Sequence, residues 1–216
     1  MYNFIPDVFA SGNFLFLGDI MMTKTRKLVV TAMLSSIAAV LMLIEFPIPF
    51  IAPPFYKLDF SEIPALIGAF SMGPVAAITI EAVKVLVNFL LNGSSTGGVG
   101  EIANFLIGCS FVIPASIIYK YKKTKKQAII SMAIGTLSMA VLGVFINAYV
   151  MIPIYSQIMP LKQIIQMGMD IVPFITDTLT FCIFCVAPFN LIKGVLVSAV
   201  TGIIYKPLSR VIHPKN

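Results

Sequence analysis

The stretch "NGSSTGGVGE", residues 92–101, separates two strongly apolar runs of the chain. One run covers Val75–Leu91, and the other extends from Val99 to the lysine-rich "YKYKKTKK". Each run approaches or exceeds the roughly 20 apolar residues that a helix needs to cross a bilayer. The glycines, serines and threonine between them are typical of a turn. The stretch therefore predicts a connection between two membrane-spanning helices, and this sets the fold class.

The composition of the whole chain agrees with a membrane location. Of the 216 residues, 58% are hydrophobic and 11% are charged, whereas about 25% are charged in an ordinary globular domain. The mean hydropathy is +0.97. The length suits one compact domain with about six spanning helices, and it is too short for a long multi-repeat transporter.

The apolar runs predict an all-α integral membrane protein with six transmembrane helices. Four prolines in eight residues interrupt the chain after the first run, which gives a long first loop. Pro153, Pro160 and Pro173 interrupt the region before the last helix, where we expect a long fifth loop with a short interfacial helix. Pro188 suits the first position of the sixth helix. The expected helices are 28–46, the short segment 62–72, 75–91, 99 to about 119, about 128–150, and 188–205.

Basic residues predict the orientation, because short loops rich in lysine and arginine stay in the cytoplasm. Eleven of the fifteen basic residues fall on one side of a six-helix arrangement. Both termini are therefore expected in the cytoplasm, and the first, third and fifth loops outside. The eleven are Lys24, Arg26, Lys27, Lys120, Lys122, Lys123, Lys125, Lys126, Lys206, Arg210 and Lys215.

Residues 1–21 contain no lysine or arginine, so they lack the basic region of a signal peptide. Met22, followed by "TKTRK", resembles a natural start. We therefore expect residues 1–21 to be an unstructured extension, and residues 22–216 to form a single six-helix membrane domain.

The glycine-rich stretch admits more than one interpretation. A phosphate-binding loop of the Walker type needs a lysine and a preceding strand, and both are missing. A flexible hairpin is one alternative. The other is a ligand-contacting loop whose glycines let the backbone approach a ligand, with Glu101 and Asn104 as side-chain partners.

Two further sets of polar residues lie on helix faces. Glu81, Lys84 and Asn88 share a face of one predicted helix, where they form either an internal ion pair or part of a ligand site. Asn190 and Lys193 share a face at the outer end of the last helix, and Asn147 lies near the outer end of the fifth. Their donors and acceptor suit the edge of a heteroaromatic ring with imide-like carbonyls. Helix capping with a snorkelling lysine is the alternative.

Small residues recur four apart on the first helix, as Ala32-xxx-Ser36 and Ser35-xxx-Ala39. Such faces let helices approach closely in lipid, either within the bundle or against another membrane protein. The pair Cys182 and Cys185 is a lone CxxC, which is weak evidence for a metal or redox site. Buried small hydrophobic residues are the simpler interpretation.

Four separated motifs together resemble one family. "FYKLDFSEIPALIGAFSMGP", "EAVKVLVNFLL", "NGSSTGGVGEIANF" and "PFNLIKG" occur in this order. The chain is thus similar, from about Lys24 to Tyr205, to the riboflavin-specific S components of energy-coupling factor (ECF) vitamin transporters.

The resemblance implies a non-enzymatic subunit of the bacterial cell membrane that captures riboflavin from outside with high affinity. A transmembrane coupling protein and two cytoplasmic ATPases would drive transport. No cofactor, metal or nucleic acid is expected. The family docks its coupling protein through an AxxxA face on the first helix, which here reads Ala32-xxx-Ser36.

Riboflavin would match the polar and aromatic inventory. Phe55, Leu58 and Phe60 would cover the ring as a first-loop lid, and Asn147, Asn190 and Lys193 would bind its uracil-like edge. The ribityl hydroxyls would meet a set of groups near the outer surface, namely Asp59, Glu62 or the backbone of Thr96, Gly97 and Gly98.

Two other classes of function remain open on the sequence alone. A stand-alone secondary carrier would couple transport through Glu81 and Lys84, but the chain is small and has no visible inverted repeat. A membrane thiol oxidoreductase would use Cys182 and Cys185, but no polar neighbours that would lower a thiol pKa are evident.

Overall fold

The computed structural model describes residues 24–94 and 96–212, with side chains described as far as residue 204. The predicted extension, residues 1–21, lies outside the described residues, as does part of the C-terminal tail. The described part is helical apart from one short antiparallel strand pair, in which Phe46 faces Leu58 and Pro47 faces Lys57.

The helices follow one another with short connections, except for the first loop and the segment around α8. In chain order the elements are α2 Lys24–Leu43, β1 Phe46–Pro47, β2 Lys57–Leu58, α3 Glu62–Met72, α4 Pro74–Asn92, α5 Val99–Tyr121, α6 Lys125–Ile146, the π-helical turn η1 Asn147–Met151, α7 Ile152–Tyr155, α8 Leu161–Met169, α9 Thr178–Phe181, the π-helical turn η2 Cys182–Val186, and α10 Ala187–Ile212.

Among the described residues, five helical segments are long and apolar enough to cross a membrane: α2, α4, α5, the continuous segment Lys125–Tyr155 and the continuous segment Thr178–Ile204. This confirms the predicted all-α membrane class. The remaining predicted span, α3, has 11 residues and is therefore only about 16 Å long. Every residue from Glu62 to Phe70 is buried, so α3 packs inside the bundle along much of its length.

The last helix begins earlier than the sequence predicted, because Pro188 lies inside a continuous helical segment. A proline removes one backbone hydrogen bond and crowds the preceding turn. Here the π-helical turn η2 precedes it, and Ala187 N–H bonds to the carbonyl of Cys182, five residues back. This wider turn accommodates the proline without ending the helix. The expectation that Pro188 opens the helix was wrong.

The same arrangement occurs once more, at Pro153. There Ile152 N–H bonds to the carbonyl of Asn147 across η1, again five residues back. The helix that begins with α6 therefore continues through Tyr155. The short helix expected in the following region corresponds to α8, whose buried residues are Ile164 and Gly168.

A capping box starts the last helical segment. The Asp177 carboxylate accepts hydrogen bonds from the backbone N–H and the hydroxyl of Thr180, at 2.7 and 2.8 Å. These two bonds hold the pKa of Asp177 below its ordinary value. A negative charge at this position also suits a helix N-terminus.

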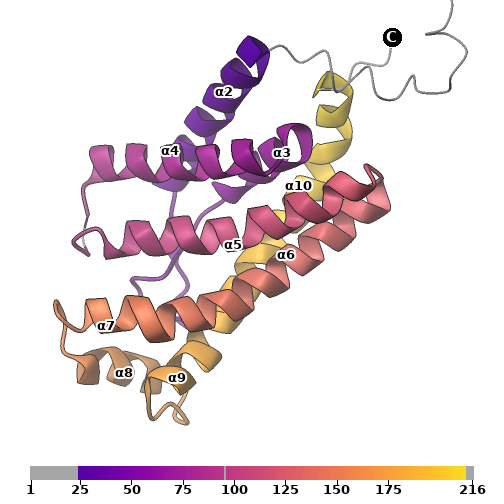
Figure 1. Ribbon diagram of the computed structural model, residues 1–216. Helices are drawn as coiled ribbons and strands as arrows, with labels where there is room; N and C mark the ends of the chain where they lie inside the picture. Colours follow the sequence, from indigo (N-terminus) through magenta and orange to yellow (C-terminus); the bar gives the residue numbers. More distant parts are fainter. Residues whose placement is uncertain (1–23, 95, 213–216) are drawn as a thin grey trace, which may run out of the picture.

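The molecule has two distinguishable halves. In Figure 1 the α5–α6 turn and the end of α10 lie toward the right and top, whereas the α4–α5 turn, α7, α8 and α9 lie at the left and lower left. We call the first the lysine-rich half and the second the loop-rich half. α10 passes through both.

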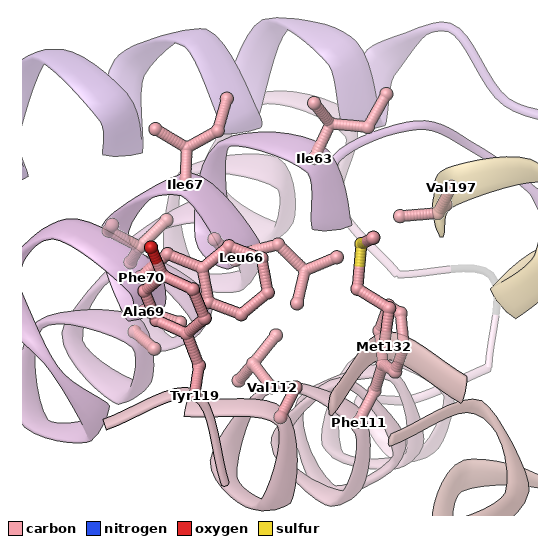
Figure 2. Packing of buried hydrophobic residues seen from close by; sticks show 14 of the residues in the cluster. Ile63, Leu66, Ile67, Ala69, Phe70, Phe111, Val112, Tyr119, Met132 and Val197 are labelled. Atoms are coloured by element: carbon pink, nitrogen blue, oxygen red, sulfur yellow. The ribbon is translucent and has the colours of Figure 1, made fainter. Parts of the chain in front are cut away.

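Each half has its own apolar cluster. The cluster of the lysine-rich half packs side chains of α3, α5, α6 and α10, including Leu66, Phe111 and Val197, as Figure 2 shows. The cluster of the loop-rich half gathers the first loop, η1, α8, α9 and the start of α10, including Leu58, Phe181 and Phe189. Phe60 packs against both clusters.

Candidate ligand-binding site

Lys84 on α4 is the centre of a buried ionic network. Its ammonium lies 2.8 Å from Glu81, 2.9 Å from Glu62 and 2.9 Å from the hydroxyl of Ser61. All four side chains are at most 1% exposed. Three acceptors for three N–H groups leave this ammonium fully paired, so its structural role is to join α4 to the start of α3.

Lys193 on α10 extends the network to the first loop. Its ammonium donates to Asp59 at 2.9 Å and lies 3.4 Å from Glu62. Asp59 also accepts from the backbone N–H of Ser61 at 2.8 Å and from its hydroxyl. Lys193 thus joins α10 to Asp59 in the first loop, which lies 134 positions earlier in the chain. One hydrogen bond to a described residue leaves this ammonium further N–H groups for a ligand acceptor.

Gly108 on α5 lets the carboxylates pack against a helix backbone. A Cβ added there would lie 2.3 Å from Glu81 Oε2 and 3.1 Å from Glu62 Oε2. Glu81 Oε2 pairs with the Lys84 ammonium, whereas Glu62 Oε2 and Glu81 Oε1 have no hydrogen-bond partner within the described part of the chain. A larger residue at Gly108 would displace the network, and nothing in the sequence motifs drew attention to this position.

Gly143 on α6 brings the two predicted asparagines together. Asn147 donates its amide N–H to the Gly143 carbonyl at 2.8 Å. A Cβ added at Gly143 would lie only 2.4 Å from the amide nitrogen of Asn190. Asn190 is 3% exposed, and its Nδ2 has no partner among the described residues. A buried amide donor without a partner is costly, so this atom points to a ligand.

Tyr56 in the first loop holds the side-chain amide of Asn147. Its hydroxyl donates to Asn147 Oδ1 at 2.8 Å, which pairs both ends of the Asn147 side chain. The sequence analysis did not single out Tyr56. The sequence signal for a role of Tyr56 is an aromatic ring with a polar hydroxyl, located in the motif "FYKLDF".

Aromatic rings from three regions surround this point. Phe55 and Tyr56 of the first loop lie 4.7 Å apart between ring centroids, and Phe55 lies 5.8 Å from Tyr155. Tyr56 in turn lies 5.8 Å from Phe189. Leu58 is fully buried in the same cluster and Phe60 is partly buried against it. The first loop is therefore folded into the loop-rich half.

The glycine-rich stretch forms a closed turn. Ser94 accepts from Gly98 N–H at 2.7 Å and donates to Glu101 at 2.9 Å. Thr96 accepts from Gly100 N–H at 2.9 Å. Gly97 and Gly98 have positive φ values, which favour glycine.

This turn connects to the aromatic rings through Tyr155, whose hydroxyl lies 3.3 Å from the place of a Gly100 Cβ. The predicted partner Asn104 follows on α5, and its Oδ1 has no donor among the described residues.

The predicted site residues thus fall into two groups. In the first group Lys193 contacts Asp59 and Glu62, Asn147 and Asn190 meet at Gly143, and Leu58 and Phe60 belong to the neighbouring apolar cluster. The other group, Thr96, Gly97, Gly98 and Asn104, lies at the α4–α5 turn and the start of α5. Tyr155 lies next to both Phe55 and Gly100 and so connects this turn with the aromatic rings.

The two small-residue pairs on α2 have different surroundings. Ser35 and Ala39 are buried, whereas Ala32 and Ser36 are exposed. The Ser36 hydroxyl donates to the Ala32 carbonyl at 3.0 Å, so it needs no partner from another helix. Ser35 and Ala39 therefore pack within the bundle, whereas Ala32 and Ser36 are free to contact another protein.

Cys182 and Cys185 are free thiols and are fully buried in the apolar cluster of the loop-rich half. Their packing agrees with the interpretation as small hydrophobic residues.

These features define an all-helical membrane protein with buried polar side chains next to a group of aromatic rings. The chain belongs to the family of ECF transporter substrate-specific components, whose model matches residues 26–205. It is therefore a substrate-binding subunit of such a transporter.

Individual relatives agree with this assignment. The riboflavin transporter RibU of Staphylococcus aureus is 38% identical over 188 residues, which cover 87% of this chain and 93% of the relative. The riboflavin transporter FmnP of Bacillus subtilis is 35% identical over 183 residues, covering 84% and 91%.

A solved structure, described under "Structure and mechanism of the S component of a bacterial ECF transporter", matches with a TM-score of 0.70 at 36% identity, covering 88% of this chain and 99% of that one. The family and these relatives are transporter components, which confirms the prediction that the chain is not an enzyme.

Proposed function

We propose that the chain captures riboflavin on the outer side of the membrane for ATP-driven uptake. The observation that carries the proposal is the buried, unpartnered amide nitrogen of Asn190, one helical turn from Lys193 and close to the rings around Tyr56. Donors beside apolar, aromatic walls are what a planar heteroaromatic ring with carbonyl groups requires. The names of the two curated relatives support the same ligand.

In this proposal, different residues bind different parts of riboflavin. Asn190 Nδ2 and a remaining N–H of Lys193 donate to the carbonyls of the uracil-like edge, and Asn147 orients Asn190 through Gly143. Phe55, Leu58 and Phe60 of the first loop cover the ring.

The ribityl hydroxyls extend toward the second group of polar residues. Asp59 and Glu62 reach them from the network, and the backbone of Thr96, Gly97 and Gly98 reaches them from the α4–α5 turn. Asn104 Oδ1, which lacks a donor, accepts from a hydroxyl.

The proposed topology has six helices, with both termini in the cytoplasm and long first and fifth loops outside. The placement of the lysine-bearing α5–α6 turn at the same end as the end of α10 supports it (Figure 1). α3 serves as the second helix, and the inward-folded first loop completes the crossing that its 11 residues are too short to make alone.

The partners in this proposal are a transmembrane coupling protein and two cytoplasmic ATPases. The exposed Ala32 and Ser36 face on α2 supports docking of the coupling protein, since small residues let two helices approach closely. Replacing Ala32 with Leu should abolish co-purification of that protein while leaving riboflavin binding unchanged. Ala82→Leu, an equal change at an exposed position on α4, is the control. Normal assembly of Ala32→Leu would mean that docking uses another face.

The test of the ligand is direct. The protein is purified in detergent from cells supplied with riboflavin, and its visible absorption spectrum is recorded. The ligand-free protein is then titrated with riboflavin while flavin fluorescence is followed. We expect flavin bands at about one flavin per chain and saturable quenching. A colourless protein with a flat titration would refute riboflavin as the ligand and would favour a different small solute.

A further inference from the structure

An apolar groove runs between α6 and α10, away from the candidate ligand site. Its volume is about 630 Å³. From α6 it is lined by Lys125, Met132 and Leu137, among others, and from α10 by Leu191, Ala199 and Gly202, among others. Among the described residues of this lining, Lys125 is the only charged side chain, so the occupant must be apolar over most of its length.

The groove widens toward Lys125. At its narrow end the helices touch, because a Cβ added at Gly194 would lie 2.6 Å from Thr136. Two turns further along α10, a Cβ at Gly202 would find its nearest neighbour, Met132, only at 4.0 Å. The groove is therefore open to the surface beside Gly202, which is exposed.

The hydroxyls on the floor of the groove require no ligand. Thr136 and Ser198 lie 3.5 Å apart and can bond to each other. Ser198 is partly exposed and Ala199 is exposed beside it. The groove thus offers an apolar channel that is open to the surface along its side.

The length of the groove and the charge at its end indicate which kind of ligand it can hold. From Lys125 to Leu137 the groove follows twelve residues of α6, about 18 Å along the axis. One leaflet of the hydrocarbon core is about 15 Å thick. At the wide end, Lys125 is exposed beside the exposed Lys122 and Lys126. The channel therefore has the length of one acyl chain, with positive charge at the end where a head group would lie.

A transmembrane helix fits less well. A helix about 10 Å across and about 18 Å long occupies roughly 1,400 Å³, more than twice the volume of the groove. A partner helix would therefore enter it only with the side chains of one face.

We propose that this groove binds one acyl chain of an anionic phospholipid, with its phosphate at Lys125. Basic pockets between membrane helices are known to hold anionic head groups. The assignment to the cytoplasmic leaflet rests on the proposed topology, whereas the site itself rests only on the membrane location of the chain.

The experiment measures retained lipid by native mass spectrometry. Delipidated protein in detergent is mixed with phosphatidylglycerol or with phosphatidylcholine of the same acyl chains. We expect one phosphatidylglycerol per protein, bound at least ten-fold more tightly than phosphatidylcholine. Ala199→Leu should lower retention of both lipids at least ten-fold, because the new side chain fills the channel. Lys125→Gln should remove the preference for phosphatidylglycerol and leave acyl-chain binding in place.

Matched controls separate this site from general lipid adhesion. Ala82→Leu, on the exposed face of α4, and Lys27→Gln, at the start of α2, should retain lipid as the unaltered protein does. Riboflavin titration of all four variants should be unchanged, so a failure of the ligand proposal would be visible separately. Equal retention in Ala199→Leu, or no preference between the two lipids, would overturn the proposal. Crosslinking of a cysteine placed at Ala199 to the coupling protein would instead identify a protein interface.

Discussion

The loop-rich and lysine-rich halves use the same helix, α10, for opposite purposes. In the loop-rich half α10 presents Asn190 and Lys193 to a buried polar region. In the lysine-rich half it presents Val197 to an apolar core and Gly202 to a surface groove. Polar groups in a membrane interior are costly, so a buried group without a partner, such as the amide nitrogen of Asn190, lowers the stability of the first half. In the second half the same helix packs against apolar side chains.

The substitution with the largest expected effect on stability is Lys84→Met. Removing the ammonium leaves the buried Glu81 without its cation and Glu62 with only the 3.4 Å contact to Lys193, which should destabilise the protein by about 3–5 kcal/mol. Unfolding by titrated sodium dodecyl sulfate measures this free energy. Lys57→Met is the matched control, because Lys57 pairs with Glu45 at the surface and such pairs contribute only about 0–1 kcal/mol.

Equal losses for Lys84→Met and Lys57→Met would mean that the network contributes no more than a surface pair. A triple variant with Lys84→Met, Glu62→Gln and Glu81→Gln should recover much of the loss, since it removes the unpaired charges. Failure of this recovery would show that the network is needed for its geometry and not for charge balance.

The second test concerns the amide that lacks a partner. Asn190→Ala should weaken riboflavin binding by about 1–3 kcal/mol, the cost of a lost buried hydrogen bond, and should leave the unfolding free energy nearly unchanged. Flavin fluorescence titration measures the affinity. Ser198→Ala, two turns further along α10 in the other half, should leave affinity unaltered. Unchanged affinity in Asn190→Ala would remove this residue from the proposed ring-edge site.

A third test is Tyr56→Phe, which removes one hydroxyl and keeps the ring. The lost hydrogen bond to Asn147 should weaken riboflavin binding by about 1 kcal/mol, because the first loop and the amide are then held less firmly. Stopped-flow release of riboflavin should become faster. A Phe189→Leu variant serves as the comparison, because it alters the rings and leaves the hydroxyl. An unchanged release rate in Tyr56→Phe would mean that this bond does not hold the loop.

The sequence predicted the membrane class, most helix positions and the chemical types at the site, because those depend on apolar run length and on polar residues within such runs. The start of the last helix was predicted wrongly at Pro188. Proline usually marks a helix start, and a π-helical turn that absorbs it has no local sequence signature. Two such turns, before Pro153 and Pro188, account for the longer helices.

Pairing within the site was the part that residue patterns could not supply. The sequence placed Lys193 with Asn190 on one helix face, but the contact with Asp59 joins segments 134 residues apart. Gly108 and Gly143 were missed for the same reason, since their role is to leave room for side chains of other helices. Such tertiary contacts become visible only when the helices are packed together.

The smallest test makes the same substitution in both halves. Gly98→Ala places a side chain at φ 91°, a left-handed conformation that should destabilise the protein by roughly 1 kcal/mol. Gly202→Ala lies inside α10, where its Cβ meets nothing closer than 4.0 Å, so higher helix propensity should stabilise it by about 0.5–1 kcal/mol. Thermal unfolding in one detergent measures both. Shifts of the same sign would contradict the division between a half whose turns require glycine and a half whose groove merely tolerates it.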